Sequence, residues 1–139
     1  MNILFVVCAV LNAAVAVLHI GCIYYGAPWY RFFGAGEQMA ILAEQGSIQP
    51  TIITTGIVLV LSSWSIYALS GAGVIVRLPF LKWALSAITF IYLLRGIAGF
   101  FLISEPLGRS PQFWLWSSII CLSFGVIHLI GLKQTWSNL

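Results

Sequence analysis

A single arginine, Arg95, lies inside an otherwise apolar stretch of membrane-spanning length, residues 81–104. A guanidinium placed among side chains that face hydrocarbon costs about 2.5–3.5 kcal/mol on insertion scales, so it needs a partner, a path to water or a functional role. Three uses stay open. Arg95 snorkels to the interface or pairs with Glu37, Glu44 or Glu105, it provides a fixed positive charge in a cavity that binds a ligand, or it contacts another protein.

Other polar side chains are expected in the same half of the membrane as Arg95. At 1.5 Å per residue, His19 lies about 9 Å below the end of its span, and Arg95 lies about 14 Å below the end of a span that runs in the same direction. Tyr92 shares a helical stripe with Arg95, Thr55 enters the second span from this side, and Asn12 lies on the small-residue face that also carries His19. The predicted ligand-binding residues are Arg95, His19, Glu37, Tyr92, Glu44, Asn12 and Thr55.

The spacing of the titratable residues gives little support for a haem, metal or proton-transfer site. His128 lies about 6 Å from the opposite membrane face by helical rise, too far from His19 for the two to share one haem iron. His19 and Cys22, three residues apart, could share a metal ion with Glu37, but one such pair is a weak signal. No predicted span contains Asp or Glu, the usual proton site of small exporters. We therefore expect no metal and no cofactor.

The composition requires lipid as the main solvent. Of 139 residues, 61% are hydrophobic and only 6% are charged, against about 25% charged residues in soluble domains. At about 20 residues per span, the chain has room for four spans in a single domain, residues 1–139. The bases behind the net charge of +3 are isolated, so the chain has no stripe for nucleic acid.

These patterns predict an all-α integral membrane protein, an antiparallel four-helix bundle with a short interfacial amphipathic helix between the first two spans. The interfacial helix is expected over residues 34–45, where Glu37 and Glu44, seven residues apart, share one face. The N-terminal apolar segment is interpreted as a span and not as a signal peptide, because no Lys or Arg precedes it. The predicted spans are residues 3–25, 51–70, 80–104 and 112–132.

The basic residues give an orientation. The side with both termini carries Arg77, Lys82 and Lys133, and the other side carries Arg31 and Arg109. Acidic residues count little for topology, so the three-to-two bias predicts both termini in the cytoplasm, in a cell (inner) membrane.

The leading hypothesis for function is a non-catalytic module that binds or transports a small amphipathic or anionic molecule, such as a lipid, a fatty acid or a quinone, on the side of the first and third loops. One alternative is an accessory or assembly subunit of a larger membrane complex. Another is a lipid- or quinone-modifying enzyme that uses His19 as acid/base and Arg95 to bind an oxyanion, which requires a carboxylate or hydroxyl beside His19. The expected partners are membrane lipids, with a homodimer or a larger membrane protein as further partners.

Overall fold

The residues that the structure describes form six α-helices, and four of these are long and apolar enough to cross a membrane. The computed structural model describes residues 2–33, 37–104 and 111–139. This confirms the predicted all-α fold with four apolar helices of spanning length. The helices are α1 (Ile3–Tyr25), α2 (Ala27–Phe32), α3 (Glu37–Glu44), α4 (Gln49–Ala72), α5 (Leu81–Phe101) and α6 (Pro111–Thr135), followed by the 3-10 helix η1 (Trp136–Asn138).

Local capping signals fix where the long helices begin and end. The side chain of Asn2 caps α1 by accepting the Phe5 backbone N–H at 3.0 Å. Gly26 and Gly73 end α1 and α4 with φ of 73° and 83°, backbone angles that glycine adopts without a steric cost. Pro50 stands in the first turn of α4, where its missing N–H is harmless.

The connection between α1 and α4 holds two short helices instead of the one that was predicted. The prediction of a helix over residues 34–45 corresponds to α3, while residues 34–36 and 105–110 lie outside the described part of the chain. The additional helix, α2, begins after the break at Gly26 and has Pro28 in its first turn. The sequence analysis missed α2 because a six-residue helix is too short to show a period.

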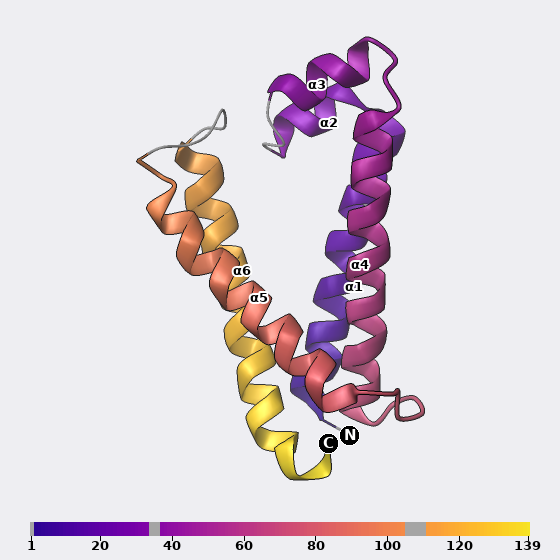
Figure 1. The fold of residues 1–139 in the computed structure, drawn as a ribbon, viewed down its shortest axis with the longest axis vertical. Helices are drawn as coiled ribbons and strands as arrows, with labels where there is room; N and C mark the ends of the chain where they lie inside the picture. The colour runs from indigo at the N-terminus through magenta and orange to yellow at the C-terminus, as the bar shows by residue number, and fades with distance from the viewer. Residues whose placement is uncertain (1, 34–36, 105–110) are drawn as a thin grey trace.

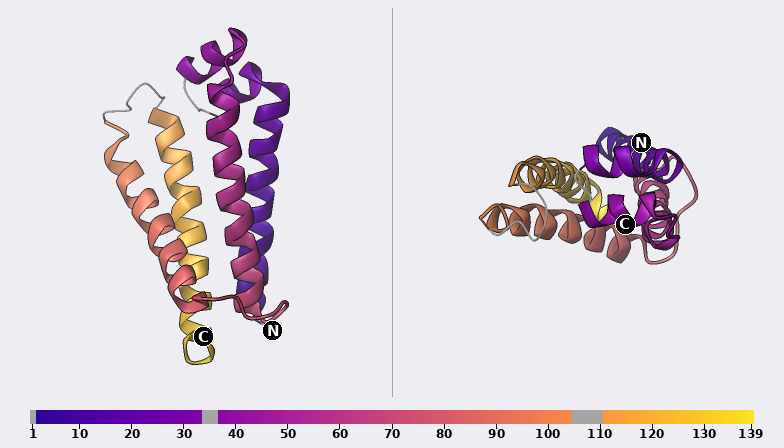
Figure 2. Two further views of the ribbon diagram at one scale, coloured as in Figure 1. Left: turned by 45° about the vertical axis from the view of Figure 1, so that its right-hand side comes forward. Right: turned by 90° about the horizontal axis from the view of Figure 1, so that it is seen from above.

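The four long helices form two antiparallel hairpins, α1 with α4 and α5 with α6 (Figures 1 and 2). At the end with both termini the hairpins meet around Phe5, which is fully buried and faces Gly71 of α4 and Gly131 of α6. Asn2 strengthens this end by donating its backbone N–H to the Ala72 carbonyl at 2.9 Å and its side-chain amide to Gln134 at 3.0 Å. Towards α2 and α3 the two hairpins diverge (Figure 1).

Two glycines let α5 and α6 approach closely. A Cβ atom on Gly96 would lie 2.9 Å from the Leu122 backbone nitrogen, and one on Gly125 would lie 3.1 Å from the Leu93 backbone nitrogen. Small residues at such crossings provide the packing that holds helices together in lipid, where apolar side chains gain little from leaving the acyl chains.

We predict that Gly96→Ala lowers the free energy of unfolding by about 1–3 kcal/mol, because the new methyl group forces α5 away from α6. The matched control is Gly56→Ala on α4, where a Cβ meets nothing within 4 Å. The control should be neutral or stabilising, by up to about 1 kcal/mol. Unfolding in dodecyl sulfate titrations, followed by circular dichroism, measures both variants; equal effects would contradict the close approach.

Candidate functional site

Arg95 is turned towards the neighbouring helix α6. Its Nη2 donates to the Ser117 hydroxyl at 3.3 Å, and its guanidinium carbon lies 4.7 Å from the centre of the Trp114 ring. An arginine over a tryptophan face is attracted by the ring by about 0.5–2 kcal/mol. The guanidinium therefore lies against α6.

One donor of this guanidinium lacks an acceptor. Arg95 Nη1 is buried and forms no hydrogen bond with any residue that the structure describes, and the same is true of the Ser118 hydroxyl. Both groups lie against Gly99: a Cβ on that residue would be 2.8 Å from Nη1 and 1.9 Å from the Ser118 oxygen. The missing side chain of Gly99 thus makes the space that the two polar groups occupy.

A pocket of about 400 Å³ lies between α2 and α6, at the end where the hairpins diverge. This volume is within the range of about 300–1,000 Å³ found for small-molecule sites. Ser117, which accepts the hydrogen bond from Arg95, lines this pocket. The Ser117 hydroxyl therefore links the Arg95 guanidinium to the pocket wall. Most of the remaining lining is aromatic or basic: Arg31, Phe32, Phe33, Phe113 and Trp116.

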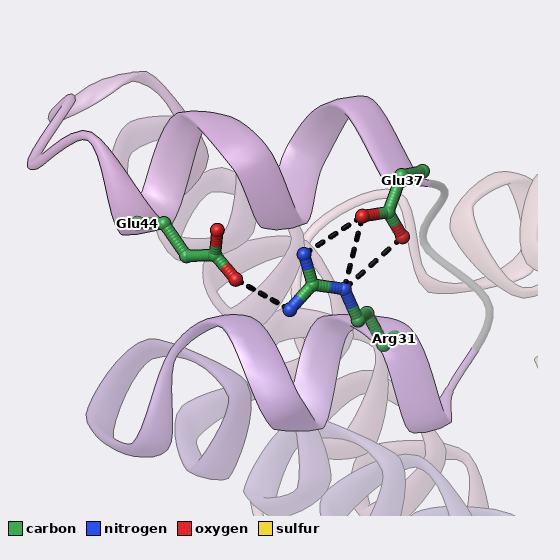
Figure 3. Close-up of polar contacts among 3 residues, drawn as sticks. All are labelled: Arg31, Glu37 and Glu44. Carbon is green, nitrogen blue, oxygen red and sulfur yellow. Dashed lines mark hydrogen bonds and ion pairs between the residues drawn. The ribbon is translucent and has the colours of Figure 1, made fainter.

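Arg31 ties α2 to α3 through both glutamates of α3 (Figure 3). Its Nε and Nη2 contact the Glu37 carboxylate at 2.7–3.1 Å, and its Nη1 contacts Glu44 at 2.5 Å. The hydrogen bonds that Arg31 donates lower the pKa of Glu37. The bonds to Glu37, and to a smaller extent the bond to Glu44, raise the pKa of Arg31. Glu37 and Glu44 therefore pair with Arg31 and not with Arg95, while Glu105 lies outside the described residues.

His19 does not join these groups. Its Nδ1 bonds the carbonyl of Val15 in its own helix at 2.8 Å, and no carboxylate or hydroxyl in the described part of the chain bonds its ring. The enzyme hypothesis required such a partner. Thr55 is exposed, and the buried residue is its neighbour Thr54, which hydrogen-bonds the Tyr30 hydroxyl at 3.1 Å and so docks α2 on α4.

Asn12 and Tyr92 meet in a separate buried cluster that also contains His128. The Tyr92 hydroxyl donates to the Asn12 carbonyl oxygen, and the Asn12 amide nitrogen lies 3.2 Å from His128 Nε2. This pattern assigns Nε2 as an acceptor, so Nδ1 carries the proton and donates it to the Phe124 carbonyl at 2.6 Å. The cluster joins α1 to α5 and α6 with a neutral histidine.

The sequence analysis placed His128 near a membrane face and did not include it in a polar cluster. A signal for it was present: the small-residue stripe Ser117, Cys121, Gly125 continues after three further residues to His128. Ser117, which accepts the hydrogen bond from Arg95, belongs to the same stripe. Among the described residues, no three His, Cys, Asp or Glu side chains are grouped closely enough to hold a metal ion.

Together these features are those of a multi-pass membrane protein. At one end of its helices, Arg95 and Ser117 lie beside the pocket between α2 and α6. No protein-family model, curated protein or solved structure matches the chain.

We predict that Asn12→Ala lowers the free energy of unfolding by about 1–3 kcal/mol, because it leaves the Tyr92 hydroxyl and His128 Nε2 without their partner. Ser63→Ala is the matched control, since Ser63 is exposed and bonds only the Leu59 carbonyl of its own helix, at 2.9 Å. The control should stay within about 0.5 kcal/mol of the unaltered protein. The same detergent unfolding assay measures both, and equal losses would show that the buried cluster contributes nothing special.

We predict that the docking of α3 on α2 weakens only at strongly acidic pH. The pKa of Glu37 is depressed in the folded protein, so its stabilising contribution is present above the ordinary glutamate value of about 4.3 and is lost as the pH falls through the lower folded value. Amide hydrogen-exchange protection in α3, corrected for the intrinsic pH effect, measures the docking. Glu37→Gln should lower this protection at neutral pH and flatten its pH dependence; an unchanged profile would contradict the role of the carboxylate.

Proposed function

We propose that the protein binds a small amphipathic molecule with an anionic or carbonyl-bearing head, such as a lipid, a fatty acid or a quinone, between its two hairpins at the α2–α3 end. Binding, or transport of the bound molecule, needs no chemical step. The observation that carries the proposal is the positive charge of Arg95, which faces α6 beside a pocket and has no carboxylate partner among the described residues.

The charges around the pocket favour an anionic head. Arg31 reaches the pocket already neutralised by two carboxylates, so it adds little net attraction. Arg95 brings a charge that no described acid compensates, and it acts on the pocket through Ser117. In surroundings of low dielectric, a partner of opposite charge stabilises such a cation more strongly than in water.

The remaining lining suits an apolar tail. Phe32, Phe113, Trp116 and Ile120 surround the polar wall of the pocket. Apolar and aromatic linings with a few oriented polar groups are typical of small-ligand sites. Aromatic side chains are also typical of the membrane interface, where a molecule with a charged head and an apolar tail would lie.

The proposed location is the cell (inner) membrane with both termini in the cytoplasm. The support is the excess of bases at the end with both termini, where Arg77, Lys82 and Lys133 are found, over the two bases of the other loops. Membrane lipids are then the partners closest at hand, and a second copy of the chain is a further proposed partner.

We predict that Arg95→Gln weakens binding of a doxyl-labelled stearic acid by about tenfold or more, because a hydrogen bond to a charged group contributes about 1.5–3 kcal/mol. Binding is read from quenching of tryptophan fluorescence in detergent, and Trp116→Phe identifies the part of the signal that arises in the pocket. Lys133→Gln is the control, because it removes an exposed cation outside the pocket.

The variants separate binding from folding. Circular dichroism and size-exclusion chromatography report whether Arg95→Gln is folded, and Ser117→Ala tests the same wall if it is not. A folded Arg95→Gln or Ser117→Ala protein that binds the fatty acid as tightly as the unaltered protein would overturn the proposal.

A further inference from the structure

The end of the molecule opposite the pocket between α2 and α6 carries basic side chains and no acidic ones. Arg77, Lys82 and Lys133 all belong to this end, and the three acids of the sequence, Glu37, Glu44 and Glu105, all belong to the other two loops. Both chain termini and the α4–α5 connection lie here (Figures 1 and 2). An anion that approaches this surface therefore meets three basic side chains, and no Asp or Glu side chain belongs to this end.

Two adjoining pockets open at this end and share Arg77, Leu81 and Leu139. The first, of about 450 Å³, has polar walls from the ends of α4 and α6, including Ser70 and Gln134. The second, of about 610 Å³, runs along the start of α5. Arg77 lines both the first pocket, with its polar walls, and the second pocket, where most of the lining residues are apolar.

The loop that carries Arg77 is held in place by side chains of α4. Ser70 donates its hydroxyl to the Val76 carbonyl at 2.9 Å and accepts the Leu78 N–H at 3.0 Å, so it bonds the backbone on both sides of Arg77. The Tyr67 hydroxyl donates to the Pro79 carbonyl at 3.1 Å. These bonds reduce the conformational freedom that the loop would lose on binding a ligand.

The end of this loop and the first turn of α5 present large apolar side chains outward. Phe80 is 80% exposed and is held at a φ of 56°, an uncommon backbone angle for a bulky residue, and Trp83 is 73% exposed. Both line the second pocket together with Lys82, whose ammonium lies 4.3 Å from the centre of the Trp136 ring. Aromatic groups beside lysine and arginine are typical of the membrane interface.

The donors of Arg77 are only partly used. In the described part of the chain its guanidinium makes one hydrogen bond, from Nη2 to the backbone oxygen of Leu139. A guanidinium has five N–H donors in a planar fork that matches the oxygens of a phosphate group. The other donors of Arg77 can therefore bind an anion without breaking the contact with Leu139.

From these observations we propose a second binding site, for the phosphate group of an anionic phospholipid, formed by Arg77 and Lys82 at the end with both termini. The phosphate oxygens bind the Arg77 fork and the Lys82 ammonium, and an acyl chain lies along Phe80 and Trp83. This site does not depend on the function proposed for the pocket between α2 and α6. Its chemistry is that of a phosphate ester, which a lipid or a soluble phosphate could supply.

The test compares lipid retention by four forms of the protein: unaltered, Arg77→Gln, Lys82→Gln and Lys133→Gln. Each is reconstituted in nanodiscs of phosphatidylcholine with or without phosphatidylglycerol, released into mild detergent and examined by native mass spectrometry. Lys133 is an exposed base of the same end that lines neither pocket, so its variant reports the general effect of surface charge. That general effect is worth about 1 kcal/mol per base, or about fivefold.

We predict that retention of phosphatidylglycerol falls by about tenfold in Arg77→Gln and Lys82→Gln and by about fivefold or less in Lys133→Gln, while retention of phosphatidylcholine is unchanged. Equal losses in all three variants would overturn the site in favour of a general positive surface. If Arg77→Gln fails to fold by circular dichroism, Lys82→Gln against Lys133→Gln decides the question.

A separate arm identifies the source of the phosphate. Inorganic phosphate is added to the detergent-solubilised protein in place of phosphatidylglycerol, at constant ionic strength. A lipid site predicts that inorganic phosphate neither binds nor displaces phosphatidylglycerol, because it lacks the acyl chain. Saturable phosphate binding that Arg77→Gln abolishes, without retention of phosphatidylglycerol, would overturn the lipid as the occupant and leave a site for a soluble phosphate.

Discussion

The hydrogen bonds of Asn12 to Tyr92 and His128 join one hairpin to the other at mid-depth. In lipid, apolar side chains gain little from packing on each other, so polar contacts and close approach have to hold helices together. The Asn12 amide satisfies both partners at once and is itself fully buried. With the core around Phe5, it fixes the half of the bundle nearer the termini. The divergence of the hairpins, and the pocket between them, are therefore confined to the other half.

The position of Arg95 follows from the packing of its own hairpin. Gly96 and Gly125 bring α5 and α6 so close that a Cβ would collide with the facing helix. Gly99 lacks a side chain, and the guanidinium of Arg95 lies beside it, against Trp114 and Ser117. The charge therefore faces α6, near the wall of the pocket between α2 and α6.

The sequence was informative wherever a feature is local. The lengths of the apolar runs predicted the four spans to within a few residues of the ends of α1, α4, α5 and α6. The sequence placed Tyr92 and Arg95 on one helical stripe, and both side chains hydrogen-bond residues of other helices. The pairing of Arg31 with the two glutamates of α3 was harder to predict, because α3 packs back on α2 and no periodicity in the sequence encodes that packing. His128 was missed for a different reason, since it was judged by its depth relative to His19 and not by its own helical stripe.

The two ends of the molecule use positive charge differently. Arg95 is half-buried between helices, so it has lost part of its hydration, and salt in the surrounding water screens it weakly. Arg77 is exposed on a loop, and Lys82 lies at the start of α5 near the interface, where ions screen charges over about 8 Å at physiological ionic strength. A cation of the first kind favours one geometry strongly, whereas cations of the second kind attract many anions weakly. At the site proposed for the end with both termini, selectivity would therefore come from the fixed loop and its apolar side chains, while at the site proposed for the α2–α3 end the charge itself would provide it.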